Sequence, residues 1–67
     1  MLSDAKVRIK SIIERLTTET RSIFSEKVFS LAAELGIGES HVKASLQELV
    51  AENFITEPMH GVLRRVP

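Results

Sequence analysis

The sequence predicts a mostly α-helical domain that ends in a small β-hairpin. Three segments carry apolar residues at the three- and four-residue spacing of amphipathic helices. The short stretch "GIG" separates the second of these segments from the third, as a tight turn between helices would. The closing stretch "ENFITEPMHGVLRRV" holds two short apolar runs joined through a proline and a glycine, which is typical of a hairpin.

The first helix is expected over residues 3–16. Ser3 can cap its N-terminus, and Asp4 in the first turn suits the positive end of the helix dipole. The polar stretch "TTETRS" that follows has poor helix propensity and indicates a connector. The apolar stripe of this helix consists of Ala5, Ile9, Ile12, Ile13 and Leu16.

A short strand and a second helix are expected next. Ile23 and Phe24 form an apolar step that predicts a strand over residues 22–24. Ser25 is the expected N-cap of a helix over residues 26–35, and Gly36 is expected to end it in the left-handed conformation. The core side of this helix is expected to hold Val28, Leu31, Ala32 and Leu35.

The third helix is expected over residues 39–52. Ile37 is the apolar pin of the preceding turn, and Gly38 is an acceptable N-cap. Asn53 suits the end of the helix because asparagine tolerates a left-handed backbone. The core-facing residues are expected to be Val42, Leu46, Leu49 and Val50.

The hairpin is expected to have strands over residues 54–56 and 62–66. Its connection, bounded by Pro58 and Gly61, is predicted to be longer than a two-residue turn. Two helices joined by a short glycine-bearing turn form a helix-turn-helix, and a hairpin placed directly after them is a wing. The sequence therefore predicts one winged helix-turn-helix domain over residues 1–67, with three helices, a short strand and a C-terminal wing.

Length and composition restrict the kinds of protein to consider. Sixty-seven residues make one domain, which is either free-standing or part of a longer protein. The chain has no cysteine, so it can form neither a disulfide nor a thiolate metal site. No apolar run approaches the roughly 20 residues that span a bilayer, and Lys6, Arg8 and Lys10 interrupt any signal-peptide core. We therefore expect a cytoplasmic protein without membrane contact.

The charges balance overall but are unevenly distributed. Residues 1–27 carry six Lys/Arg against four Asp/Glu, whereas residues 28–57 carry one lysine against five glutamates. The last ten residues add two arginines and no acid. DNA binding draws much of its affinity from cations that displace counterions from phosphates. The acidic middle of the chain therefore disfavours tight DNA binding.

The outer side of the third helix is the first candidate for a functional contact. In a helix-turn-helix the second helix of the pair enters the major groove. Ser40 and Gln47 could reach base edges there, and Lys43 could reach a phosphate or a guanine. Glu39 and Glu48 would repel the phosphates. The alternatives for this side are a solvated face or a protein contact.

The wing and the first helix supply the other candidates. Met59 and His60 are expected at the wing tip, with Arg64 and Arg65 behind them. The arginines either contact phosphates or the minor groove, or are ordinary edge-strand charges that discourage sheet pairing. A secondary basic surface is expected from Lys6, Lys10, Arg15 and Arg21.

No catalytic, cofactor or metal site is predicted. The serines and histidines lack the context of a nucleophile with its base, and "GIG" links two helices instead of following a strand as a phosphate loop does. His41 and His60 lie nineteen residues apart, and no cysteine accompanies either. A domain of this size has little room for a water-excluding cleft. The chain is therefore expected not to be an enzyme on its own.

A set of residues between Phe24 and Val66 forms a pattern that is less generic than helical or strand periodicity. These residues are Gly36, Ile37, Val42, Leu46, Leu49, Ile55, Glu57, Pro58, Gly61, Leu63, Arg64, Arg65 and Val66. In this pattern the segment resembles the C-terminal winged-helix domain of archaeal minichromosome-maintenance (MCM) replicative helicases, and the likeness covers about two-thirds of the chain. Two differences stand out, because the family usually has glycine where this chain has Asn53 and often an aromatic residue where it has Val62.

The resemblance implies an appendage of an ATP-driven ring helicase whose ATP-binding and unwinding residues lie outside this chain. Such an appendage would modulate DNA replication through contacts with initiation or replication proteins and with the helicase core. It would bind DNA weakly at most, be associated with the nucleoid and be monomeric in isolation. The residues themselves leave one alternative open, a small DNA-binding transcriptional regulator that reads duplex DNA with helix 39–52 and the wing.

Overall fold

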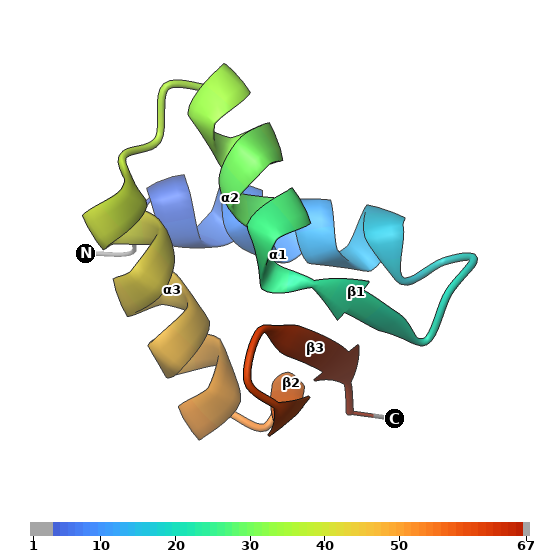
Figure 1. Ribbon diagram of the computed structural model, residues 1–67. Coiled ribbons are helices and arrows are strands. Elements are labelled where there is room, and N and C mark those ends of the chain that lie inside the picture. The colour runs from blue at the N-terminus through green and yellow to red at the C-terminus, as the bar shows by residue number, and fades with distance from the viewer. Residues whose placement is uncertain (1–3, 67) are drawn as a thin grey trace.

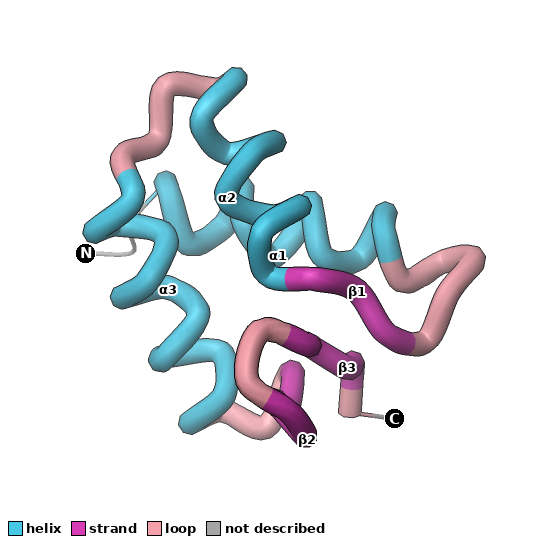
Figure 2. Tube along the Cα trace, in the orientation of Figure 1, coloured by secondary structure: helices cyan, strands magenta, loops and turns pink. Residues whose placement is uncertain are grey.

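Three helices and a three-stranded antiparallel sheet make up residues 4–66, which are the residues that the computed structural model describes (Figure 1). The helices cross one another on one side of the molecule, and the strands gather on the other (Figure 2). The elements in chain order are α1 (Asp4–Leu16), β1 (Ser22–Phe24), α2 (Ser25–Glu34), α3 (Glu39–Ala51), β2 (Ile55–Met59) and β3 (Val62–Arg65).

The helix starts differ in part from the expectation. Helix α2 begins at Ser25, so the predicted capping role of Ser25 is wrong. Phe24 occupies the N-cap position, with φ −84° and ψ 135°, and makes no side-chain cap hydrogen bond. The Ser25 N–H instead donates to the carbonyl oxygen of Gly61 at 2.9 Å. Gly38 is the N-cap of α3 as predicted, whereas the predicted cap Ser3 lies outside the described residues.

Helices α2 and α3 end in the same way, through a residue with positive φ. Gly36 has φ 79° and Asn53 has φ 63°, which confirms both predictions. Each helix closes with a Schellman motif, in which the N–H of the following residue reaches back over five positions. Ile37 donates to Ala32 at 3.0 Å, and Phe54 donates to Leu49 at 2.9 Å.

Helix α1 ends at Leu16 as predicted, whereas α2 and α3 end one residue before the expected positions. Helix α2 ends at Glu34 instead of residue 35, and α3 ends at Ala51 instead of residue 52. Leu35 and Glu52 are the C-cap residues.

The sheet has the order β1-β3-β2, so that the last strand lies between the other two. Ile23 pairs with Leu63, and both are buried on the core side together with Ile55 of β2. The register between β2 and β3 shifts by one residue between Thr56 and Met59. The extra residue of β2 is a β-bulge.

The expected bounds of the two hairpin strands and the expected length of their connection are wrong. The first strand runs over Ile55–Met59 instead of residues 54–56, and the second ends at Arg65 instead of residue 66. The connection is only His60 and Gly61, because the strand continues through Pro58. Proline has no N–H to give to a ladder, but β2 is an edge strand with a bulge, where proline is tolerated.

The core forms between the inner stripes of the helices and the inner face of the sheet. Leu35 and Val50, which we expected in it, are 50% and 40% exposed. Leu35 follows the last residue of α2. Val50 lies at the margin of the apolar stripe of α3, next to the buried residue Leu49. The buried residues are Ile9, Ile12, Ile13, Ile23, Val28, Ala32, Val42, Leu49, Ile55 and Leu63. This layout is compatible with the predicted winged helix-turn-helix.

Candidate interaction surface

The outer side of α3 presents an uncharged strip. Val42, Ser45 and Leu49 are buried and fix which side of the helix faces the core. Positions on the opposite side follow from the 100° rotation between successive helical residues. They are Ser40, Ala44, Gln47 and Ala51, all of which are exposed. Ser40 and Gln47 therefore lie together where the sequence predicted a contact surface.

Two of the α3 glutamates face α1 instead of this strip. The Nζ atom of Lys6 lies 3.2 Å from Oε1 of Glu48 and also donates a hydrogen bond to Glu52. The Lys6 side chain is only 14% exposed. The hydrogen bond to Glu52 raises the pKa of Lys6, so the ammonium form is favoured. Lys6 therefore joins two helices and does not belong to the predicted secondary basic surface.

Lys43, the remaining cation of α3, has its own acidic neighbour. Its Nζ atom lies 3.6 Å from Oε1 of Glu39, four residues earlier on the same helix. Both side chains are largely exposed, at 64% and 72%. Lys43 is thus accessible as predicted, but Glu39 offsets much of its charge toward any approaching phosphate.

Arg65 and Lys10 are engaged by an aromatic ring. The guanidinium carbon of Arg65 lies 4.6 Å from the centre of the Phe54 ring, and the Nζ atom of Lys10 lies 4.8 Å from it. Arg65 also forms an ion pair with Glu14 at 3.8 Å. These contacts tie α1 to the hairpin. They give two of the predicted contact residues a structural role.

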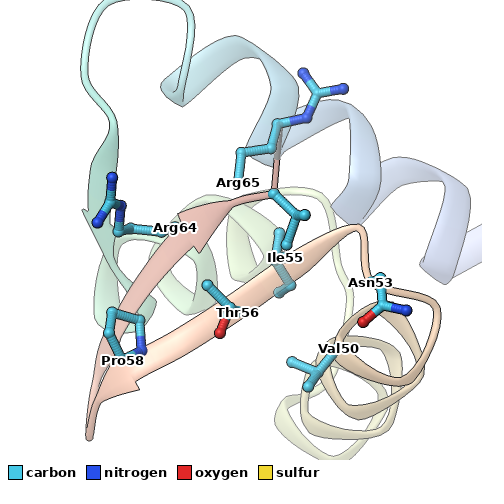
Figure 3. Close-up of a pocket in the computed structure, with 8 residues that line it drawn as sticks. Val50, Asn53, Ile55, Thr56, Pro58, Arg64 and Arg65 are labelled. Atoms are coloured by element: carbon cyan, nitrogen blue, oxygen red, sulfur yellow. The ribbon is translucent and has the colours of Figure 1, made fainter.

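The side chain of Arg64 lies on the opposite face of the sheet from that of Arg65. It pairs with Ser22 of β1 and Thr56 of β2, and alternation along β3 places it on the outer face of the sheet, opposite Leu63. Figure 3 shows Arg64 and Arg65 extending away from each other on either side of the strand. Within residues 4–66 no carboxylate lies within 4.0 Å of the Arg64 guanidinium.

The hairpin turn is fixed against α2. Gly61 has φ 83°, and its N–H donates to Oε2 of Glu57 at 2.9 Å. Its carbonyl oxygen accepts the hydrogen bond from Ser25 at the start of α2. His60 is exposed in this turn as predicted, whereas Met59, which was expected in the loop, is the last residue of β2 and is 68% exposed.

A shallow crevice of about 510 Å³ lies between the end of α3 and the hairpin (Figure 3). Val50 and Asn53 form its helical wall, and Thr56 and Pro58 form part of the strand wall. Arg64 and Arg65 contribute to its lining, and no acidic residue does. Both predicted contact arginines therefore border the crevice, and of the two Arg64 is the one without a carboxylate or an aromatic ring as partner among residues 4–66.

Arg15 and Arg21, the other residues of the predicted secondary basic surface, do not line this crevice. Arg15 lines a separate hollow between α1 and α2, and Arg21 is exposed just before β1. Sequence reasoning missed Phe24 and Val62 as surface residues. The alternation of the strand around buried Ile23 could have assigned Phe24 to the outer face.

Residues 4–66 provide neither a cluster of metal ligands nor a membrane-spanning helix. No group of three or more His, Asp or Glu side chains in residues 4–66 is placed to hold a metal ion. None of the helices in that range is long and apolar enough to cross a membrane.

Comparison of the chain with family models, with curated proteins and with solved structures found no match in any of the three.

Proposed function

We propose that this chain is a non-catalytic winged-helix module that acts through protein contacts and binds DNA weakly at most. The main support for the proposal is that several of the cations make ion pairs or aromatic contacts within the domain itself. Lys6 and Lys43 are paired with glutamates, and Lys10 and Arg65 contact Phe54. The other five cations are Arg8, Arg15, Arg21, Lys27 and Arg64. None of them lies on α3 and only Arg64 lies on the hairpin, so these two elements offer few free cations to phosphates, on which affinity for DNA largely depends.

The arrangement of α2, the "GIG" turn and α3 supports the helix-turn-helix part of this proposal. The hairpin that follows corresponds to the wing. In a DNA-reading protein of this kind, α3 would be the recognition helix. Its outer strip, however, offers two small alanines with Ser40 and Gln47, and the one lysine nearby is accompanied by Glu39. Such a surface is better suited to close packing against a protein than to a phosphate backbone.

We further propose a role in DNA replication, as the regulatory C-terminal module of an archaeal MCM-type helicase. The support is the sequence resemblance over Phe24–Val66. Its Gly36-Ile37 pair forms the Schellman turn, and its Glu57-Pro58 pair forms the bulge whose carboxylate holds the hairpin turn. In this role the module would modulate helicase activity through contacts with initiation or replication proteins and with the helicase core.

A titration with labelled duplex and single-stranded DNA tests the proposal. At about 150 mM salt, near physiological ionic strength, we expect no saturable binding below the micromolar range. Binding at submicromolar concentration with a steep dependence on salt would contradict it.

One observation favours the alternative, a DNA-binding transcriptional regulator. The strip of α3 is uncharged instead of acidic, because the helical rotation places uncharged residues on it and directs Glu48 toward Lys6. A double variant, Lys43→Ala with Arg64→Ala, separates the two functions. A DNA reader would lose most of its affinity for duplex DNA in this variant, whereas weak binding that is unchanged by the substitutions would exclude that role.

A further inference from the structure

The outer face of the sheet carries a row of apolar side chains that crosses all three strands. Phe24 of β1 pairs with Val62 of β3, and Val62 pairs with Met59 of β2. Phe24 is 69% exposed and Met59 is 68% exposed, while Val62 between them is partly buried. These are the two most exposed large apolar side chains of the described residues. They lie in one line instead of being scattered singly.

The residue types of this face are those of a protein interface. Aromatic residues, methionine and arginine are enriched in the buried centres of interfaces, and this face combines Phe24, Met59 and Arg64. Arg64 is two positions from Val62 along β3 and therefore lies on the same side of the sheet. Contiguous exposed apolar residues bordered by polar ones are typical of interaction sites.

The charges around the row specify the partner. At the Phe24 end, Glu26 and Lys27 border a small hollow and offset each other. At the Met59 end, the carboxylate of Glu57 is engaged by the N–H of Gly61. Arg64 lies on this face and has no carboxylate within 4.0 Å among residues 4–66, and the same holds for Lys27 at the margin of the face. The face is complementary to a surface that is apolar along one line and acidic beside it.

Two other occupants fit less well. In a two-fold contact between copies of this chain the same face meets itself, so each copy would bring its own Arg64 and Lys27 to the contact and like charges would approach each other. A nucleic acid would supply phosphates to Arg64 but would leave Phe24 and Met59 against a charged backbone.

We propose that the Phe24–Val62–Met59 row, with Arg64 beside it, docks an amphipathic helix of a partner protein that carries an Asp or Glu next to its apolar stripe. This inference rests on the proposed protein-docking function and assigns it a surface and a partner chemistry. Strands lie about 4.8 Å apart, so the row spans about 10 Å. A helix covers the same distance between residues i and i+7, with i+3 or i+4 between them.

A displayed library of helical peptides tests the proposal. The probes carry apolar residues at i, i+3 or i+4, and i+7, with the neighbouring positions randomised among Asp, Glu, Ser, Lys and Arg. Selection on the wild-type protein is expected to enrich Asp or Glu over Lys and Arg, by about tenfold for a preference of 1.4 kcal/mol. Arg64→Glu is expected to reverse this preference.

The variant Phe24→Ser/Met59→Ser is expected to lose at least about tenfold in affinity for the selected peptides. It should remain folded, because both side chains are exposed and serine is favourable at the N-cap position of α2, which Phe24 occupies. The matched control Val7→Ser/Leu35→Ser removes two exposed apolar side chains elsewhere and should bind as the wild type does.

Three results would overturn the assignment. They are selection without an enriched peptide, enrichment of basic peptides, and peptide binding that Phe24→Ser/Met59→Ser leaves unchanged. A wild-type dimer in sedimentation that this double variant dissociates would assign the row to a second copy instead. Weak DNA binding together with a failed selection would leave the proposed function standing and remove only this surface, whereas tight DNA binding would remove the function itself.

Discussion

The ammonium group of Lys6 on α1 lies 3.2 Å from the Glu48 carboxylate on α3 and also holds Glu52, one turn further along the same helix. One cation of the basic N-terminal region thereby pairs with two acids of the acidic middle region. The uneven charge distribution of the sequence is thus partly cancelled in the fold. The contact joins α1 to the side of α3 that borders the uncharged outer strip.

The first prediction concerns the pH dependence of this contact. The hydrogen bond to Glu52 raises the pKa of Lys6 above 10.5, its ordinary value, because the folded state favours the charged form. The resulting stabilisation is complete below pH 10.5 and is lost as the pH rises through the folded-state pKa. Thermal unfolding of the wild type should therefore show a fall in Tm above that pH.

The variant Lys6→Met should have a lower Tm than the wild type near neutral pH and should lose less of it at alkaline pH. Lys27→Met is the matched control, since Lys27 is exposed on α2 and forms no ion pair within residues 4–66. Equal alkaline losses of Tm in Lys6→Met and Lys27→Met would show that the contact with Glu48 and Glu52 does not contribute.

The second prediction concerns the ring of Phe54. Phe54→Leu keeps most of the apolar volume but removes the contacts with Lys10 and Arg65. Exposed cation–π contacts contribute about 0.5–1 kcal/mol each, so we expect a loss of about 1–2 kcal/mol in the free energy of unfolding beyond the packing loss. Urea unfolding of Phe54→Leu and of the control Phe29→Leu measures the difference. Phe29 is also partly buried, and no cation lies over its ring among residues 4–66.

The order and type of the elements could be read from the sequence because local rules determine them. The strand Ser22–Phe24 was predicted with its observed bounds, and the positive φ at Gly36 and Asn53 followed from residue type and position. Helical periodicity identified most of the core. It failed for Val50, because a residue at the margin of an apolar stripe is buried only if a neighbouring element covers it.

The candidate site was harder to predict because it depends on contacts between side chains of different helices and strands. Nothing local to Lys6 or Arg65 indicates that they meet Glu48 and Phe54, which lie far along the chain. Pro58 indicates a loop boundary in the sequence because proline usually interrupts strands, but the edge position of β2 and its bulge allow it to stay in the sheet.

The third prediction concerns the two glycines of the "GIG" turn. Gly38 has φ −70°, and a Cβ there would meet only the His41 side chain at 3.8 Å, an ordinary contact. Gly38→Ser adds an N-cap hydroxyl and restricts the unfolded chain, so it should stabilise by about 0.5–1 kcal/mol. Gly36→Ser should instead destabilise by about 1 kcal/mol, because Gly36 has φ 79°. Midpoints of urea unfolding that shift in the same direction for both variants would contradict this.

The fourth prediction concerns the electrostatics of α3 toward DNA. Two unit charges about 10 Å apart in water interact by about 0.4 kcal/mol, so removing two repulsive carboxylates should strengthen weak duplex binding about fourfold. Glu48→Gln/Glu52→Gln removes them and also releases the ammonium group of Lys6. Fluorescence anisotropy at low salt measures the change in Kd, and circular dichroism shows whether the variant remains folded.

The matched control is Glu26→Gln/Glu34→Gln on α2, which makes the same change in net charge. If DNA approaches α3, the first double variant should gain clearly more affinity than the control. Equal gains would show that only net charge matters and that α3 does not face the DNA. An α3 that faces a protein partner predicts that second result, because the carboxylates of Glu48 and Glu52 would then lie no nearer to the DNA than those of Glu26 and Glu34.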